Sequence, residues 1–144
     1  MERIIREAAL ADCSAITRLN REEMGYDYPQ EKTFVKLQAC LANPAHRIFV
    51  AEWGREVVGY LHLEEYDVLY AGHMVNVLGI AVSSAWRRQG VGRALLSAGE
   101  AWARSKEAVT VRLVSGEARK GAHAFYQSLG YTGNKLQRNF KKPL

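Results

Sequence analysis

The sequence predicts a single domain, residues 1–144, of the α/β class and more specifically of the α+β type. Two observations support this prediction. Apolar runs with a period of two residues occur along the same chain as runs at helical spacing. One stretch, residues 77–102, passes from an apolar, β-branched run through a glycine-containing loop into a helical pattern. A length of 144 residues suits a single domain with a substantial core.

The first half of the chain is expected to form a strand, two helices and a hairpin. Asp12 precedes apolar residues at helical spacing that end near Gly25, and Asn43-Pro44 ends a second helical pattern. Gly54 lies in the turn between two strand-like runs. The expected elements are a strand at 3–8, helices within 12–25 and at 32–41, and strands at 47–53 and 57–66.

The second half alternates strands and helices. Gly130 follows the last helical pattern, where a glycine commonly ends a helix. The expected elements are strands at 74–82 and 109–114, helices at 92–105 and 121–129, and two weak strands at 131–132 and 138–141. The complete order is therefore β-α-α-β-β-β-α-β-α-β-β.

Composition and charge exclude several classes of protein. The chain is 48% hydrophobic and 24% charged, as is typical of globular proteins. No apolar run is long enough to cross a membrane and the first residues lack the apolar segment of a signal peptide, so we expect a cytoplasmic protein. The net charge is +5, but the basic residues are scattered and no aromatic residues alternate with them, so we expect no nucleic-acid partner. Cys13 and Cys40 are expected to be reduced and to lack the partners of a metal site.

The loop after residue 82 is suited to bind an anion. The first N–H groups of a helix have no partner within the helix, and its dipole favours negative charge there. Gly90 and Gly92 remove side chains that would keep a phosphate from those groups, and arginines at 87, 88 and 93 add positive charge.

Two common phosphate-binding motifs do not match this loop. A P-loop needs lysine and serine or threonine after its second glycine, whereas arginine and alanine follow Gly92. The third glycine of a dinucleotide fingerprint falls on Leu95. The pattern that remains is Arg-x-x-Gly-x-Gly, with Arg87 as its first residue, and it resembles the acetyl-CoA signature of the GCN5-related N-acetyltransferase (GNAT) family.

The resemblance extends from Ile4 to about Phe140, because the order of elements is also that of the family. It implies a mixed central sheet of about seven strands with helices on both faces. It also implies that the strands ending near Val82 and Val114 splay apart and that backbone groups between them bind the pantetheine arm of acetyl-CoA, while the loop holds the pyrophosphate. The cofactor-binding residues expected on this basis are Ile80, Ala81, Val82, Arg87, Arg88, Gln89, Gly90, Val91, Gly92, Arg93 and Arg119.

A second stretch resembles the other signature of the family. Residues 122–131 read Ala, three residues, Tyr126, three residues, glycine and an aromatic residue. The resemblance implies that Tyr126 donates a proton to the thiolate that leaves when an amine attacks the thioester. The alternative is that Tyr126 is an aromatic residue of the core. Arg119 stands where many members of the family have asparagine.

The general base is not assigned by the sequence. Relatives often place a carboxylate on the strand before the phosphate loop, but the corresponding positions are Asn76 and Gly79. Acidic or imidazole groups that could act instead, directly or through water, are Asp27, Glu64, Glu65, Asp67, His73 and Glu117.

The acceptor is expected near residues 24–30 and 67–72, with Tyr26, Asp27, Tyr28 and Glu65 as its contacts. The leading hypothesis is acetyl transfer to the primary amine of a small molecule. The alternatives are a sensor that binds acyl-CoA without turnover and an acetyltransferase of protein lysines or N-termini. The spacing resembles small bacterial members such as aminoalkylphosphonate N-acetyltransferase. We further expect a homodimer, and nothing in the sequence requires a metal.

Overall fold

A computed structural model of the protein describes residues 1–133 and 135–144. The chain divides into two compact units, Met1–Leu113 and Val114–Leu144, which we call the N-terminal and C-terminal units. Whether they behave as the expected single domain stays a prediction. No helix in the described part of the chain has the length and apolar character needed to cross a membrane.

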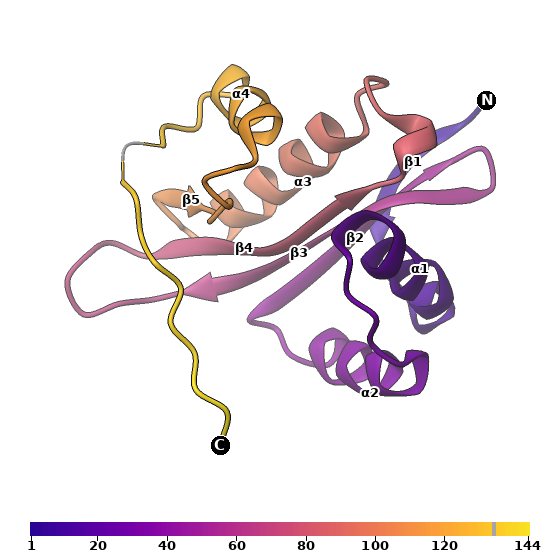
Figure 1. Cartoon of the computed structure of the whole chain (residues 1–144), viewed down its shortest axis with the longest axis horizontal. Helices are drawn as coiled ribbons and strands as arrows, with labels where there is room; N and C mark the ends of the chain where they lie inside the picture. Colours follow the sequence, from indigo (N-terminus) through magenta and orange to yellow (C-terminus); the bar gives the residue numbers. More distant parts are fainter. Residues whose placement is uncertain (134) are drawn as a thin grey trace. The chain divides into compact units, whose positions relative to one another are not determined.

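The N-terminal unit is built on a five-stranded sheet (Figure 1). Its strands lie in the order of the sequence and are antiparallel, except that β5 runs parallel to β4. The strands are β1 (Arg3–Glu7), β2 (His46–Trp53), β3 (Glu56–Tyr66), β4 (Met74–Val82) and β5 (Thr110–Arg112). The helices of this unit are α1 (Cys13–Met24), α2 (Gln30–Leu41) and α3 (Val91–Ser105), with short 3₁₀ turns at Leu10–Asp12 and Ser84–Trp86.

The mixed sheet confirms the fold class, but the expected number of strands was wrong. Five strands are present among the described residues, not about seven, and the last two expected strands are missing from the order. Residues 131–132 and 138–141 form neither helix nor strand. Leu136 and Phe140 remain exposed, so this segment has no buried face that would support a strand. The strand expected at 109–114 is reduced to the three residues of β5.

Helices cover both faces of the sheet, as expected. Ile16 and Leu19 of α1 and Leu37 of α2 form one buried cluster with Ile48 and Tyr60 of the sheet. Figure 1 shows α1 and α2 on one side of the strands and α3 on the other. Each helix buries its apolar stripe against one face, which is the arrangement that two amphipathic layers require.

Two glycines set how closely α3 approaches the sheet. A Cβ atom at Gly59 of β3 would lie 3.0 Å from Cγ1 of Val91, and one at Gly99 of α3 would lie 2.8 Å from Cδ2 of Leu61. Both distances are too short for packed carbon atoms. Glycine at these two positions therefore allows α3 to lie close against β3.

The C-terminal unit contains α4 (Lys120–Ser128). Gly130 follows this helix with a left-handed φ of 94°, as expected for a glycine after a helix end. The ring of Tyr126 contacts those of Phe125 and Tyr131, at centroid distances of 5.3 and 6.2 Å. The helix expected at 121–129 is therefore present and is shifted by one residue.

Candidate active site

The glycine-containing loop ends at the N-terminus of α3. Gly90 precedes the helix with φ 82° and ψ 10°, a left-handed conformation that glycine adopts without strain. A Cβ atom at Gly90 would find no atom within 4 Å, so the space beside the loop is open. The first N–H groups of α3 therefore border free space, as an anion-binding helix start requires.

The basic side chains of this loop are exposed to solvent. Arg87, Arg88 and Arg93 all lie at the surface, beside the start of α3. Arg87 is the one among them with an ion pair described, to Glu23 of α1, at 3.2 Å between Nη2 and Oε1. The arginines and the helix start together fit a polyphosphate group by charge and by open space.

Strand β4, which precedes the loop, is paired with β3 along one edge, but its other edge is paired with β5 only over residues 74–76. The β4–β5 pairing in the described part of the chain ends at Asn76 and Arg112. Residues 80–82 pair with 59–61 of β3 and with no residue of β5. Between them, Leu78 is an extra residue in β4, because Val77 pairs with Leu63 and Gly79 pairs with His62. This bulge and the open edge favour the expected splaying of the two strands.

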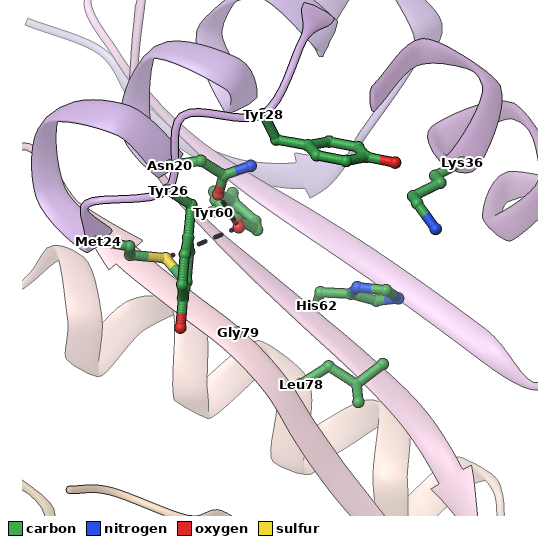
Figure 2. Close-up of a pocket in the computed structure, with 9 residues that line it drawn as sticks. All are labelled: Asn20, Met24, Tyr26, Tyr28, Lys36, Tyr60, His62, Leu78 and Gly79. Atoms are coloured by element: carbon green, nitrogen blue, oxygen red, sulfur yellow. Dashed lines mark hydrogen bonds between the residues drawn. The ribbon is translucent and has the colours of Figure 1, made fainter. Parts of the chain in front are cut away.

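A cavity of about 360 Å³ lies beside this bulge (Figure 2). Its volume is within the range of small-molecule sites. Its wall combines α1, the connection to α2, α2 itself and the middle of β3 and β4. The residues that line it are Asn20, Met24, Tyr26, Tyr28, Lys36, Tyr60, His62, Leu78 and Gly79.

Tyr60 is fixed at the back of this cavity. Its hydroxyl group donates a short hydrogen bond to Oδ1 of Asn20 and lies 3.9 Å from Sδ of Met24. Burial, together with the neighbouring Tyr26, raises the pKa of Tyr60 to about 12. The phenol therefore stays protonated at neutral pH and joins α1 to β3.

The charges around the cavity are few. Burial and the neighbouring His46 lower the pKa of His62 to about 4, so its imidazole is neutral at pH 7. Lys36 is the one residue with a permanent charge among the described residues that line the cavity, and no carboxylate is among them. A cationic group in the cavity would therefore meet aromatic rings and an ammonium group.

The residues expected to contact the acceptor fall into two groups. Tyr26 and Tyr28 line the cavity, whereas Asp27 is exposed between them and is not among the lining residues. Glu65 lies elsewhere: its Oε1 is 2.9 Å from Nε2 of His73, and its Oε2 is 3.7 Å from Nζ of Lys106.

Alternation along β3 explains this separation. Leu61 and Leu63 lie near Gly99 of α3, so Glu65 belongs to the α3 side of the sheet. His62 and Glu64 alternate with them and belong to the side of α1 and α2. The cavity is therefore on the face that carries His62, opposite the face of Glu65.

None of the carboxylates considered as a general base lines the cavity among the described residues. Glu64 accepts a hydrogen bond from Asn76 at 3.4 Å, and Asp67 lies 3.4 Å from His73. The carboxylate of Glu65 accepts a hydrogen bond from the imidazole of His73 and raises the pKa of His73. Glu117 is exposed in the C-terminal unit.

The remaining expected residues, Tyr126 and Arg119, belong to the C-terminal unit. Arg119 immediately precedes α4, and its carbonyl oxygen accepts a hydrogen bond from the N–H of His123 at 3.1 Å. Burial raises the pKa of Tyr126, and the charge of Arg119 opposes this effect. Tyr126 is therefore protonated at neutral pH, as a proton donor must be.

Among the residues that line the cavity, Tyr26 and Tyr28 were expected and Met24 lies in the expected segment 24–30. Sequence reasoning missed the others: Asn20, Lys36, Tyr60, His62, Leu78 and Gly79. A signal for three of them was available. Asn20 and Met24 are four residues apart on one helix, and Tyr60 and His62 are two apart on one strand, so each pair shares a face. Nothing local indicated that the two faces would meet.

The spacing in the sequence offered neither cysteine a partner for a metal site, but the fold brings two histidines close to Cys40. Its Sγ atom and one nitrogen each of His46 and His62 all lie within 4.8 Å of one another. These residues are separated by 6 and 16 positions and come from three elements, so no short motif contains them. Cys13 and Cys40 are both free thiols, as expected.

Comparisons with known proteins identify the family to which these features belong. A family model described as "Acetyltransferase (GNAT) family" matches residues 13–131. An "N-alpha-acetyltransferase" of Sulfurisphaera tokodaii is 32% identical over 147 residues, covering 94% of this chain and 84% of that protein. A "Mycothiol acetyltransferase" of Salinispora arenicola is 31% identical over 142 residues, and the match covers 94% of this chain and 41% of that longer protein.

Solved structures share the fold. The aminoglycoside 6'-N-acetyltransferase AAC(6')-Ih of Acinetobacter baumannii has a TM-score of 0.86 at 16% identity, with 99% of each chain covered. The structure of AAC(6')-Iy with a bisubstrate analogue of coenzyme A has a TM-score of 0.88 at 16% identity, with all of both chains covered. At these identities, the likeness concerns the fold.

Proposed function

The chain belongs to the acetyltransferase (GNAT) family and is an acetyl-CoA-dependent N-acetyltransferase; we propose that its acceptor is the primary amine of a small molecule that also carries an anionic group. The observation that carries the proposal is the charge of the cavity. Lys36 is the permanently charged residue of the described lining, and no carboxylate accompanies it.

The cosubstrate fits the loop before α3. We propose that the N–H groups at the start of α3 and the exposed arginines at 87, 88 and 93 hold the phosphates of acetyl-CoA. The open edge of β4 over residues 80–82 has backbone groups free for the amides of the pantetheine arm. Acetyl-CoA supplies the activated acetyl group, and the amine attacks its carbonyl carbon.

The cavity beside the β4 bulge is proposed as the acceptor site. Tyr26 and Tyr28 offer aromatic faces and hydroxyl groups, and Lys36 offers a positive charge near the ring of Tyr28, 6.0 Å from its centroid. Carboxylate and phosphonate groups bind to such a charge, whereas an acceptor with several cationic groups is repelled. An amino acid or aminoalkylphosphonate is therefore favoured over a polyamine or an aminoglycoside.

A second candidate is the N-terminal amine of a peptide. It is favoured by the 32% identity to a protein named N-alpha-acetyltransferase. Peptide binding would extend beyond the cavity, so a peptide of several residues with a free N-terminal amine would be acetylated in preference to the free amino acid.

Release of coenzyme A thiol over a panel of acceptors tests the proposal. The panel contains amino acids, aminoalkylphosphonates, peptides, aminoglycosides and a sample without acceptor. We expect turnover to be fastest with small anionic amines, and Lys36→Gln to raise their KM by about tenfold, the loss of one charge-assisted contact. Lys32→Gln, one turn earlier on α2 and outside the cavity, is the control.

Other results lead to other conclusions. Faster turnover of peptides supports the second candidate. Binding of acetyl-CoA without turnover of any acceptor supports a sensor. An equal KM in the wild type and in Lys36→Gln would remove Lys36 from the acceptor site.

A further inference from the structure

A cysteine and two histidines meet between α2 and the sheet, and the acetyl transfer proposed above uses none of their metal-binding capacity. Cys40 lies near the end of α2, His46 begins β2, and His62 is in the middle of β3. Ile48 of β2 pairs with His62, and Ile48 packs against Leu37 in the cluster under α1 and α2. The two histidines therefore lie on the face that α2 covers, as diagonal neighbours on adjacent strands.

The potential ligand atoms converge on one point. Nδ1 of His46 lies 2.9 Å from Nε2 of His62, and the ring planes are tilted by 38° with centroids 5.1 Å apart. The Sγ atom of Cys40 and the nitrogen atoms all lie within 4.8 Å of one another. All three residues are half-buried, so the group is shielded by the fold yet is not sealed from solvent.

The donor set is that of a transition-metal site. One thiolate and two imidazoles are ligands that Zn²⁺, Co²⁺ and Cu²⁺ prefer over the oxygen ligands of Ca²⁺ and Mg²⁺. In tetrahedral coordination with Zn–N bonds of about 2.0 Å, two nitrogen ligands lie about 3.3 Å apart. The two histidines need to separate by only a few tenths of an ångström to reach that spacing.

We propose that Cys40, His46 and His62 form a binding site for a single Zn²⁺-like transition-metal ion. The three residues fill three of four tetrahedral positions, and the fourth is free for water or another ligand. Because His62 also lines the acceptor cavity, a bound ion places positive charge beside that cavity and changes its affinity for an anionic acceptor. This last consequence rests on the proposed function, whereas the metal site itself does not.

The probe for the test is Co²⁺ added to the full-length protein after dialysis against a chelator. We expect one Co²⁺ per chain, with the visible absorption of tetrahedral cobalt and a near-ultraviolet band from thiolate-to-cobalt charge transfer. Zn²⁺ added afterwards should displace the cobalt and abolish both absorption features. Zn²⁺ alone should raise the melting temperature of the protein.

Variants identify the ligands. Cys40→Ser should remove the charge-transfer band, and Cys40→Ser and His46→Gln should each weaken Zn²⁺ binding by at least about tenfold. Cys13→Ser and His73→Gln are the matched controls and should bind like the wild type. Melting curves without metal establish that each variant is folded. If Cys40→Ser is unfolded, the cobalt spectrum of His46→Gln decides.

The absence of tetrahedral cobalt absorption in the wild type would overturn the proposal, as would unchanged binding by folded Cys40→Ser and His46→Gln. Both readouts are independent of acetyl transfer, so failure of the proposed function does not affect them. Conversely, a chain that binds Zn²⁺ yet transfers acetyl groups to no amine would leave the metal site supported and the acceptor proposal contradicted.

Discussion

The guanidinium of Arg87 and the carboxylate of Glu23 join the glycine-containing loop to α1. Nη2 of Arg87 lies 3.2 Å from Oε1 of Glu23, and Oε2 accepts a hydrogen bond from the N–H of Ser84 at 3.0 Å. The same helix carries Asn20 and Met24, which line the acceptor cavity. Glu23 therefore fixes the proposed phosphate loop relative to the helix that forms one wall of the cavity.

Arg87→Ala should weaken coenzyme A binding by about tenfold, because it removes a charge-assisted contact to phosphate. The side chain of Arg87 is 62% exposed, so N–H groups of its guanidinium other than the one that contacts Glu23 can bind a phosphate. Pantetheine without phosphates should lose little affinity, and calorimetry of both ligands distinguishes the two effects. Arg55→Ala, an exposed arginine in the β2–β3 turn, is the control. Equal losses for both ligands would exclude a phosphate contact.

Gly90→Glu should abolish acetyl-CoA binding without unfolding the protein. A side chain at Gly90 meets open space, so the fold itself has room for it. The cost of its left-handed φ is about 1–2 kcal/mol. Gly90→Ala carries the same backbone strain without the charge, so it serves as the matched control and should retain more affinity. Calorimetry and circular dichroism of both variants are the measurements, and unchanged affinity in Gly90→Glu would refute the phosphate loop.

Asp12 makes stability depend on pH in the acidic range. Burial of Asp12 opposes its ionisation, but hydrogen bonds from Arg6 and from the N–H of Ala9 outweigh this and hold its pKa below the ordinary value. A lowered folded-state pKa stabilises the fold above the unfolded pKa of about 3.9, and this contribution is lost as the pH falls further.

Asp12→Asn should therefore lower the free energy of unfolding by about 1–2 kcal/mol at pH 7, a figure reduced for the partial exposure of Arg6. The difference from the wild type should shrink below about pH 4. Urea unfolding across this pH range measures it. Glu7→Gln, which removes the exposed pair with Arg47, should change stability by less than about 1 kcal/mol. A difference that does not depend on pH would contradict the role of the Asp12 charge.

The sequence predicted the elements whose pattern is local. The strand at 74–82 and the helix after the loop follow from their own residues, and the structure confirms them within one residue. The strands at 131–132 and 138–141 failed because short apolar patterns form strands only when a neighbour covers one face, and Phe140 has none among the described residues. These two strands account for the difference between the seven strands expected and the five that the described residues form.

The same distinction between local pattern and tertiary packing holds for the site. The phosphate loop is one contiguous motif, so its chemistry is visible in the sequence. The cavity and the Cys40 cluster depend on how α1 and α2 pack over β3. This packing brings Lys36 and Cys40, both on α2, close to His62. Only tertiary packing brings these residues together, and no spacing in the sequence encodes it.

Tyr126→Phe tests whether this residue donates the proton to the leaving thiolate. The hydroxyl group would act in the transition state and not in the ground state, so kcat should fall by roughly tenfold or more while both KM values change little. The ring contacts with Phe125 and Tyr131 survive the substitution, so the melting temperature should hold. Tyr131→Phe removes a hydroxyl group from the same aromatic cluster and should keep kcat within about twofold. If Tyr126→Phe is stable and turns over like the wild type, Tyr126 is a packing residue and water protonates the thiolate.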